Sequence, residues 1–404
     1  MNGYDHSFRS STDLDRAVAL LRQIPPDPDD LPETLPEMGV GENRTLDLLA
    51  PHVLGGAAKL DASDAFAHMD PPTPWITWAM ALWNARLNQN LLHQETAPFA
   101  TEAEQRVIRW LTPFFGMGGG HMCSGSTISN LTALWAARDA GRVRRVIASK
   151  SAHLSIRKAA LILGLPYEEI ATNKHQQLDP KHLGNLTDAC LVLTAGTTTT
   201  GMIDPLELAG RAAWTHIDAA WGGPLRLSPT YSHLLNGIEA ADSVTISAHK
   251  WLFQPKDSAL ILFRNPEYVT PAISLSSGYL AEPNIGLQGS RGAAAIPLLA
   301  TLIAWGRRGM VERIDRAMML ANHFAEKIAD DEHFELWGMP RTGVTLFKPT
   351  LGTTQDFYAS LPSGILSTCT VQGAHWLRSV AANPLADIDK ILLAVRAVNF
   401  SHSS

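Results

Sequence analysis

Short apolar runs alternate with amphipathic stretches through the middle of the chain, and this alternation predicts its core. Runs rich in aliphatic and β-branched residues predict strands at 145–149, 190–194, 214–218, 243–247 and 258–263. Helical spacing of apolar positions predicts helices at 102–111, 127–140 and 204–213. Strands that alternate with helices favour a mostly parallel sheet covered by helices. The pattern therefore predicts an α/β fold.

The N-terminal region follows a different pattern. Apolar positions at helical spacing predict a short amphipathic helix at 12–24, and an acidic, proline-rich stretch then runs to Gly39 as an extended linker. After a rigid turn at 68–74, an apolar helix is expected from residue 75 to about residue 92. Its three tryptophans, Trp75, Trp78 and Trp83, are expected in the core.

The C-terminal region mixes helices with short strands. Helices are expected at 293–308, 310–329 and 387–398, with strands at 334–336 and 343–348. This mixture predicts a small α+β unit after a larger α/β domain. The chain is thus expected to have three parts: residues 1–95, 96–309 and 310–404.

Composition narrows the class of protein. The 404 residues are 45% hydrophobic, and 33 basic against 39 acidic residues give a net charge of -6, which disfavours a basic face for nucleic acid. Three cysteines without paired spacing indicate a reducing compartment and no metal site. Residues 1–11 lack an apolar signal core, and the longest apolar run, 293–305, is shorter than a membrane span of ~20 residues. We expect a cytoplasmic enzyme without a membrane partner.

A lysine beside a histidine and a tryptophan follows the predicted strand at 243–247. Lys250 would then lie at the carboxyl edge of the sheet, where α/β proteins bind ligands. Lysine forms Schiff bases with carbonyl compounds, and its pKa falls readily on burial. Taken alone, Lys250 is also compatible with a partly exposed structural lysine.

The strand at 214–218 ends in a carboxylate, Asp218, followed by two alanines and a glycine pair. Such an aspartate is usually a helix cap or turn former. Together with Lys250, it matches what proteins contribute to pyridoxal phosphate: a lysine for the aldehyde and an anion that keeps the pyridine nitrogen protonated. Ala220 points to the same side as Asp218, so its methyl group is expected to pack under a flat ring.

Two short motifs resemble the group II pyridoxal-phosphate-dependent amino-acid decarboxylases, which include the glutamate, aromatic amino-acid and diaminobutyrate decarboxylases. They are His-Ile-Asp-Ala-Ala at 216–220 and Ser-Ala-His-Lys-Trp at 247–251. The resemblance extends from about residue 68 to the C-terminus. It implies a type I, aspartate aminotransferase-like fold, in which residues 96–309 bind the cofactor. It also implies a homodimer with shared active sites that converts an L-amino acid to an amine and CO2.

The resemblance suggests where the phosphate of the cofactor lies. A glycine-rich run at 118–125 leads into a helix, whose free N-terminal amides can hold an anion, and Ser126 and Thr127 add hydroxyl donors. Thr198, in a second loop of this kind, matches a threonine beside the cofactor. Ser247 replaces a more usual aspartate or asparagine, and its hydroxyl is expected to reach the phosphate. His249 is expected to contact the phosphate as well.

Four further residues have expected roles by the same resemblance. Family members stack a histidine, here His153, on the cofactor ring, and they use a loop tyrosine, here Tyr279, to protonate the α-carbon. Arg378 is the candidate for the substrate carboxylate, because a guanidinium suits a bidentate contact. Thr73, after Pro72, is a candidate for substrate contact.

Ser290 connects the chain to its expected partner subunit. Gly-Ser-Arg at 289–291 resembles the family segment that reaches the phosphate of the neighbouring subunit.

Two alternatives to an amine-forming decarboxylase stay open. One is a decarboxylation-coupled oxidative deaminase or aldehyde synthase, which Tyr279 argues against, although Tyr279 is also compatible with a loop anchor. The other is a non-catalytic homologue, which Lys250, Asp218 and His153 argue against.

Overall fold

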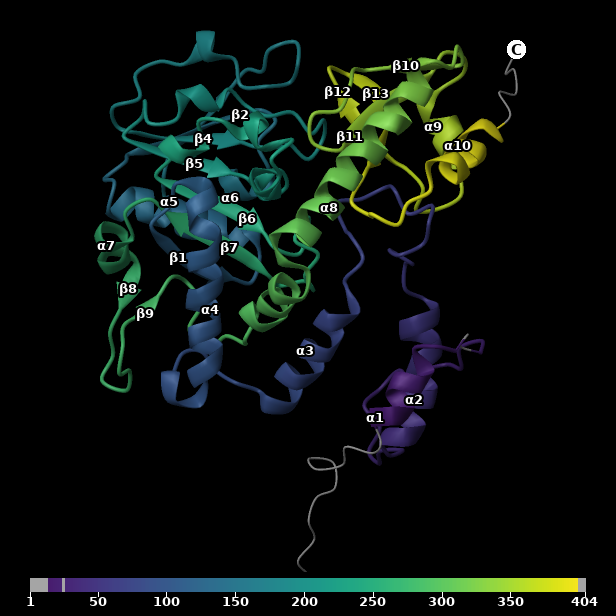
Figure 1. The fold of residues 1–404 in the computed structure, drawn as a ribbon, viewed down its shortest axis with the longest axis horizontal. Helices are drawn as coiled ribbons and strands as arrows, with labels where there is room; N and C mark the ends of the chain where they lie inside the picture. The colour runs from purple at the N-terminus through teal and green to yellow at the C-terminus, as the bar shows by residue number, and fades with distance from the viewer. Residues whose placement is uncertain (1–13, 24–25, 399–404) are drawn as a thin grey trace, which may run out of the picture. The chain divides into compact units, whose positions relative to one another are not determined.

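The computed structural model describes residues 14–23 and 26–398, and the chain divides between Lys59 and Leu60 into two compact units (Figure 1). The first unit contains α1 (Leu14–Leu20), α2 (Glu42–Ala50) and a π-helical turn (Pro51–Gly55). Within the described residues, the helix expected at 12–24 ends at Leu20, earlier than predicted, and α2 was not predicted. Positions 1–13, including the polar N-terminus, lie outside the described residues. The expected division at residues 95 and 309 stays a prediction.

A seven-stranded sheet forms the centre of the second unit, in the order β1-β7-β6-β5-β4-β2-β3. The strand β7 is antiparallel to both its neighbours, and the other pairs are parallel. The predicted mostly parallel α/β sheet is thus confirmed. The strands are β1 (Gly119–Cys123), β2 (Arg145–Ser149), β3 (Tyr167–Ile170), β4 (Ala189–Thr194), β5 (Trp214–Asp218), β6 (Ser243–Ser247) and β7 (Ala259–Phe263).

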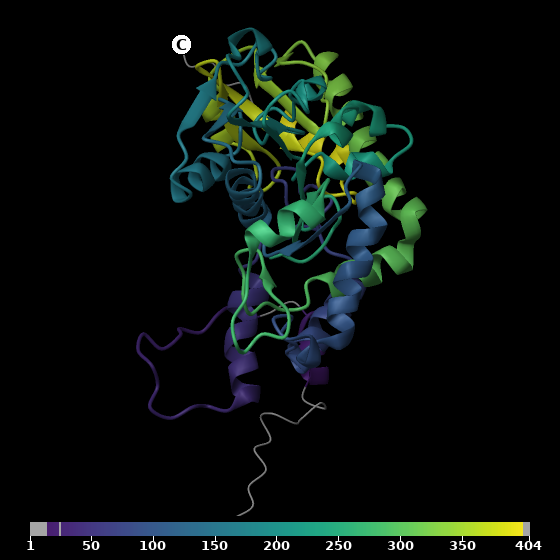
Figure 2. The ribbon, with the colours of Figure 1, turned by 90° about the vertical axis from the view of Figure 1, so that its left-hand side faces the viewer.

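Helices cover both faces of this sheet, which is why its central strands are buried along their whole length. One face packs on α5 (Ser126–Asp139) and α6 (Leu154–Ile162), and the other packs on α4 (Pro98–Leu111) and α8 (Ala295–Ala329). The helices α4 and α8 run alongside each other (Figure 2). The N-terminus of α5 follows β1 at Gly125, whose φ of 151° is one that residues with side chains rarely adopt.

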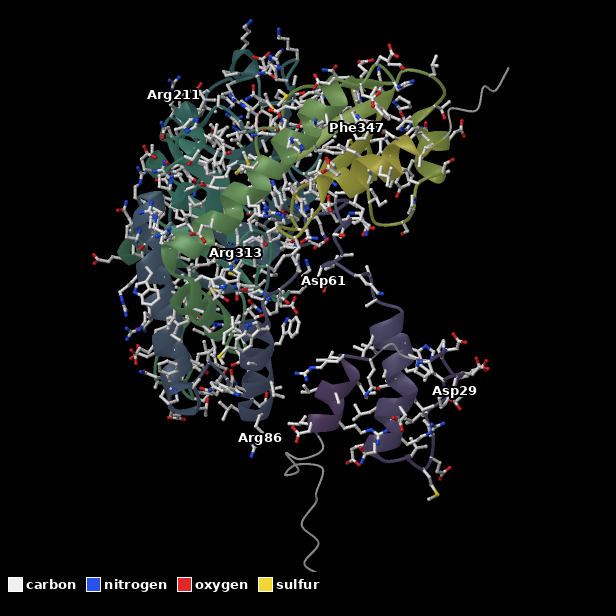
Figure 3. The ribbon with its side chains drawn as sticks, turned by 45° about the vertical axis from the view of Figure 1, so that its right-hand side comes forward. Asp29, Asp61, Arg86, Arg211, Arg313 and Phe347 are labelled. Carbon is white, nitrogen blue, oxygen red and sulfur yellow. The ribbon has the colours of Figure 1, made fainter. Side chains whose placement is uncertain are left out.

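A four-stranded antiparallel sheet forms the C-terminal part, in the order β10-β11-β13-β12. Phe347 on β11 is fully buried and packs edge-on against Phe324 and Phe334, with ring centroids 5.6 and 5.3 Å away (Figure 3). The elements here are β10 (Phe334–Leu336), β11 (Val344–Pro349), α9 (Thr354–Ala359), β12 (Ser367–Val371), β13 (Ala374–Val380) and α10 (Ile388–Arg396). This confirms the small α+β unit, with two more strands than predicted.

The remaining elements show where local patterns misled. The helix expected at 204–213 is wrong: only a 3₁₀ turn forms at Leu206–Leu208, because Gly210 takes a left-handed φ of 80°. The two helices expected at 293–329 are one helix, α8, kinked at Gly306. A short helix α7 (Pro266–Val269) precedes a hairpin of β8 (Ser274–Leu275) and β9 (Asn284–Ile285). Across residues 14–23 and 26–398, no helix is both long and apolar enough to cross a membrane.

The three tryptophans of α3 (Trp75–Leu87) are not in the core of the chain, so that expectation is wrong. Trp75, Trp78 and Trp83 are 70%, 56% and 59% exposed. The helix α3 packs against α8 along one side, while apolar residues continue around its other sides. A helix that is apolar all round needs cover on all sides. Within the second unit, the described residues therefore leave a large apolar face of α3 uncovered.

Candidate functional site

Neighbouring parallel strands bring Asp218 and Lys250 to the same edge of the sheet. Asp218 is the last residue of β5, and Lys250 lies in the turn that follows β6, the strand paired with β5. Burial lowers the pKa of the Lys250 amine, while the nearby Asp218 carboxylate acts in the opposite direction. Lowering this pKa favours the neutral amine, which is the form that attacks a carbonyl carbon.

The Asp218 carboxylate is buried among neutral hydrogen-bond donors. Asn130 Nδ2 donates to Oδ2 at 3.0 Å, and the backbone N–H of Ala220 donates to Oδ1 at 3.1 Å. The side chain is 4% exposed, and within the described part of the chain it forms no ion pair. A buried carboxylate needs compensation of its charge. It therefore fits a ligand that brings a cation, such as the protonated nitrogen of a pyridine ring.

His153 lies beside these two residues and begins α6 as its N-cap. Its Nδ1 accepts from the Ser155 amide at 3.3 Å and lies 2.8 Å from the Ser155 hydroxyl. Burial lowers the pKa of His153, Asp218 opposes this shift, and Lys250 adds to it. A neutral, flat imidazole is thus held next to Asp218 and Lys250, as predicted for a ring that stacks on the cofactor.

The start of α5 and the turn after β6 lie next to each other and can receive an anion. A Cβ built on Gly125, the residue before α5, would lie 3.8 Å from His249 Cε1. Ser247 Oγ is buried without a hydrogen-bond partner among the described residues, so it is available to a ligand. The first amides of α5, at Ser126 and Thr127, have no partner earlier in the helix. These groups fit a phosphate, as the sequence predicted.

The structure also brings Arg378 and Thr198 to this site. Arg378, on β13, is 7% exposed, and its Nε donates to the Thr198 carbonyl at 2.9 Å. Its Nη1 donates to the Ala67 carbonyl at 3.2 Å and to Ser367 Oγ at 3.1 Å. Its charge also lowers the pKa of Lys250, which places the two cations near each other. Three protein acceptors therefore orient the guanidinium, and Nη2 has no hydrogen bond to a described residue.

The segment with Tyr279 and Ser290 contacts residues of the loop between α3 and α4. Tyr279 is 69% exposed in the β8–β9 hairpin, its ring is 6.3 Å from that of His93, and its hydroxyl has no hydrogen bond to described residues. Ser290 Oγ accepts from Asn90 Nδ2 at 3.1 Å. The structure therefore does not bring Tyr279 into contact with Lys250 of the same chain.

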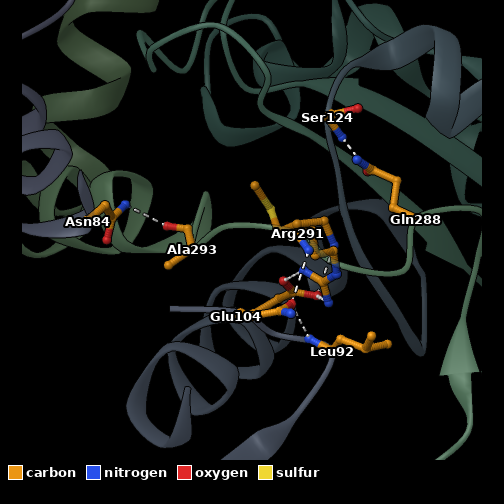
Figure 4. Close-up of polar contacts among 9 residues, drawn as sticks. Asn84, Leu92, Glu104, Ser124, Gln288, Arg291 and Ala293 are labelled. Atoms are coloured by element: carbon orange, nitrogen blue, oxygen red, sulfur yellow. Dashed lines mark hydrogen bonds and ion pairs between the residues drawn. The ribbon is translucent and has the colours of Figure 1, made fainter. Parts of the chain in front are cut away.

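An ion pair anchors this segment. Both oxygens of Glu104 accept from the Arg291 guanidinium, and the Gln288 side chain accepts from the Ser124 amide at 2.8 Å (Figure 4). Arg291 and Ser124 also line a cavity of about 550 Å³. Because Ser124 directly precedes Gly125, this cavity reaches the N-terminal end of α5. Ser290 lines the same cavity, and its contact with the phosphate of a neighbouring subunit stays a prediction.

Thr73 and two unpredicted residues complete the description of the site. Thr73 Oγ1 accepts from the Trp78 indole at 2.8 Å, so its predicted substrate contact is also still a prediction. Sequence reasoning missed Asn130 and Ser155, which contact Asp218 and His153. A polar residue on the sheet-facing side of an apolar helix was the available signal for Asn130.

Comparison with known proteins agrees with this geometry. The pyridoxal-dependent decarboxylase conserved domain matches residues 50–349. L-2,4-diaminobutyrate decarboxylase from Rhizobium meliloti is 33% identical over 79% of this chain and 71% of its own length. Phenylacetaldehyde synthase from Petunia hybrida is 29% identical over 75% of this chain and 73% of its own.

Structural similarity extends over nearly the whole chain. The structure of 4-hydroxyphenylacetaldehyde synthase from Rhodiola rosea superposes with a TM-score of 0.85, at 21% identity, over 98% of both chains. At this identity the likeness shows a shared fold. The family match and the sequence relatives show more than the fold. The chain belongs to the pyridoxal-dependent decarboxylase family, the group II amino-acid decarboxylases, and is an enzyme whose cofactor is pyridoxal phosphate.

Proposed function

We propose that this enzyme decarboxylates an L-amino acid to the corresponding amine and CO2. The observation that carries the proposal is the pairing of a buried lysine amine with a buried carboxylate at the ends of adjacent parallel strands. Pyridoxal phosphate, when bound, supplies the electron-withdrawing ring that accepts the electron pair of the broken Cα–carboxylate bond. The residues of the chain bind the cofactor, orient the substrate and return a proton to the α-carbon.

Each residue near Asp218 and Lys250 has a distinct task in this proposal. Lys250 provides the amine that holds the cofactor aldehyde and later releases the product. Asp218 keeps the proton on the pyridine nitrogen, because a buried carboxylate stabilises a nearby cation. His153 presents its flat ring to the cofactor face, with Ala220 on the same edge of the sheet as Asp218. Ser126, Thr127, Ser247 and His249 hold the phosphate.

Arg378 determines which bond breaks. Its guanidinium is fixed by Thr198, Ala67 and Ser367, and Nη2 is left to bind the substrate carboxylate. By fixing the orientation of that carboxylate, Arg378 would favour breakage of the Cα–carboxylate bond over the Cα–H bond, an effect that enzymes obtain from orientation. Thr73 is proposed to contact the substrate side chain.

We further propose that the active unit is a homodimer. The uncovered tryptophans of α3 fit a second copy of the same apolar helix, since large apolar patches on a single chain mark interfaces. Tyr279 and Ser290 do not reach Lys250 of their own chain, so we assign them to the site of the partner. Tyr279 then returns a proton to the α-carbon after CO2 has left.

An aldehyde synthase is the second candidate function. It is favoured by the Petunia relative, which is nearly as similar as the diaminobutyrate decarboxylase. Tyr279 distinguishes the two functions, because a proton donor directs the reaction to the amine, whereas its absence leaves the carbanion exposed to oxygen. The cytoplasmic location expected from the cysteines is likewise a proposal.

Borohydride reduction followed by peptide mapping tests the central assignment. We expect the cofactor on Lys250, no labelled peptide from Lys250→Ala, and no turnover by that variant. Lys256→Ala is the matched control, because Lys256 is close in sequence, exposed and paired with Asp70. Label on Lys256 in the wild-type protein would overturn the assignment. Equal release of CO2 and amine from an L-amino acid would separate decarboxylation from aldehyde formation.

A further inference from the structure

A buried row of polar side chains runs behind the cofactor site and ends at Asp218. The Trp214 indole donates to Ser243 Oγ at 3.0 Å, and Ser243 Oγ lies 2.9 Å from His216 Nδ1. His216 Nε2 lies 3.0 Å from Asn130 Oδ1, and Asn130 Nδ2 donates to Asp218 at 3.0 Å. The side chains before Asp218 make no contact that the proposed reaction uses.

The same asparagine reaches a second residue of the site. Asn130 Nδ2 also donates to Ser155 Oγ at 2.9 Å, and Ser155 Oγ lies 2.8 Å from His153 Nδ1. One side-chain amide therefore contacts both Asp218 and Ser155, the residue that holds the His153 imidazole. Asn130, His216 and Ser155 are each 0% exposed, so water does not compete for these hydrogen bonds.

The chemistry at the two ends fixes the direction of every hydrogen bond in the row. An indole N–H can only donate, and an ionised carboxylate can only accept. Asn130 Nδ2 therefore donates to Asp218, which turns the Asn130 carbonyl toward His216 and requires the His216 proton to be on Nε2. In the neutral ring Nδ1 is then an acceptor, so Ser243 donates its proton to Nδ1 and accepts from Trp214. This leaves both amide hydrogens of Asn130 for Asp218 and Ser155.

The alternative orientation of Asn130 is unfavourable on both sides. Turning the amide over would place its carbonyl oxygen against the Asp218 carboxylate and its NH2 group against the His216 N–H. Two acceptors and two donors would then face each other in a buried place, where unmade hydrogen bonds are costly. Burial also lowers the pKa of His216 to about 4, which keeps this ring neutral near pH 7.

We propose that Asn130, oriented by His216, is the positioning residue of the cofactor site: it sets the Asp218 carboxylate and turns the Ser155 hydroxyl toward His153 Nδ1, where that hydroxyl joins the Ser155 backbone amide as a donor. The inference rests on the proposed roles of Asp218 and His153 toward the cofactor. Because Asn130 brings hydrogen bonds but no charge, Asp218 keeps its full negative charge for the ring nitrogen. A cation in place of Asn130 would neutralise part of that charge.

The row itself is tested without any substitution. Neutron diffraction from the deuterated full-length protein, with and without pyridoxal phosphate, shows which nitrogen of His216 and His153 carries hydrogen. We expect hydrogen on Nε2 and none on Nδ1 in both residues, and both amide hydrogens of Asn130 toward Asp218 and Ser155. Hydrogen on His216 Nδ1 would overturn the inference whether or not the enzyme is a decarboxylase.

The role of Asn130 toward the cofactor is tested with variants and two readouts besides activity. These are the dissociation constant of pyridoxal phosphate and the chemical shift of its ring nitrogen, labelled with ¹⁵N. We expect Asn130→Ala to weaken binding by about 10-fold or more, the effect of a lost hydrogen bond to a charged group, and to shift the ring nitrogen toward its deprotonated value. Ser155→Ala should leave the ring nitrogen unchanged, and the hydrogen of His153 should stay on Nε2, because the backbone amide of residue 155 still donates to Nδ1.

Thr215→Val is the matched control. Thr215 lies on β5 next to His216, is also 0% exposed, and accepts from the Gly210 amide at 3.1 Å, outside the row. It should lower stability without changing cofactor binding or the ring nitrogen. Wild-type values of both readouts in Asn130→Ala would overturn the proposal. If the wild-type protein shows the expected hydrogen positions but decarboxylates no L-amino acid, only the proposed function is contradicted.

Discussion

Burial and charge act in opposite directions on Lys250. Burial lowers the pKa of its amine, Asp218 and Asp70 raise it, and the nearby Lys256 and Arg378 lower it again. Burial is the largest of these effects, so the amine is shifted toward its neutral form. At His153 burial is likewise the largest effect and opposes Asp218. The single buried carboxylate therefore remains the site's place for a cation, which suits a protonated pyridine ring.

Tyr279 leads to a prediction about product partition. Tyr279→Phe should still release CO2 from the substrate but form much less amine and more aldehyde, because the α-carbon lacks its proton donor. The loss should fall on kcat more than on KM, since the contact is made only during protonation. CO2 and amine are measured side by side. Equal yields of both at the wild-type rate would show that Tyr279 is an anchor of its loop.

Mixing two defective variants tests where Tyr279 acts. Lys250→Ala and Tyr279→Phe subunits, unfolded and refolded together, should regain about a quarter of wild-type activity. Half of the random two-fold dimers are mixed, and one of their two sites then has both an intact Lys250 and an intact partner Tyr279. If Tyr279 acted within its own chain, each site of a mixed dimer would contain one defective residue, and mixing would give no gain.

At the scale of elements, the strands with regular apolar runs were predictable from sequence. The predicted bounds of β2, β5 and β6 agree with the structure, because aliphatic and β-branched residues fill each of these strands. The strand β1 was missed because Gly119 and Gly120 resemble a loop. A Cβ on Gly120 would lie 2.0 Å from the Ile261 carbonyl oxygen, so close pairing with β7 explains this glycine.

The site was predictable to the extent that its residues follow strand ends. Asp218, Lys250 and His153 are brought together as expected, because β5 and β6 are neighbours and α6 begins at His153. Asn130 could not be assigned in advance, since its meaning depends on which strand α5 packs against. The exposure of Trp75, Trp78 and Trp83 was likewise unpredictable, because a tryptophan in an apolar helix is equally suited to a core and to an interface.

The helix α3 yields a prediction about assembly. Trp83→Glu should convert the proposed dimer to monomers, weakening association by about 10²-fold or more, because tryptophans at interfaces contribute strongly and a two-fold interface contains the change twice. Sedimentation velocity across a concentration series measures this. Leu393→Glu is the control, since Leu393 is 72% exposed on α10, in the C-terminal part. An unchanged dimer in Trp83→Glu would refute this placement of the interface.

For the whole molecule, buried histidines predict how stability depends on pH. Burial lowers the pKa of His216 to about 4 and that of His121 to about 3, whereas in the unfolded chain both are close to about 6.5. Below pH ~6.5 the unfolded chain therefore binds protons that the folded chain does not. The free energy of unfolding should fall as pH is lowered toward 4, by up to about 1.4 kcal/mol per pH unit for each histidine.

Urea unfolding of the cofactor-free protein at several pH values measures this dependence. His121→Asn removes one of the two groups and should reduce the slope between pH 6.5 and 4. His333→Asn is the control, because His333 lies at the surface with a side chain 52% exposed. A slope that stays the same in His121→Asn would mean that other groups determine acid sensitivity.

Two tryptophans in contact next to the site limit how such a chain can be recombined. Trp221 and Trp251, three residues after Asp218 and one after Lys250, have ring centroids 4.1 Å apart, with the rings tilted by 33°. Their indoles donate to the carbonyls of Thr342 and Ala381. The backbone of the C-terminal part thus supports the loops that hold the reactive residues. A chimaera that exchanges residues 310–404 must reproduce these two carbonyls, so the large sheet and the C-terminal sheet are inherited as one module.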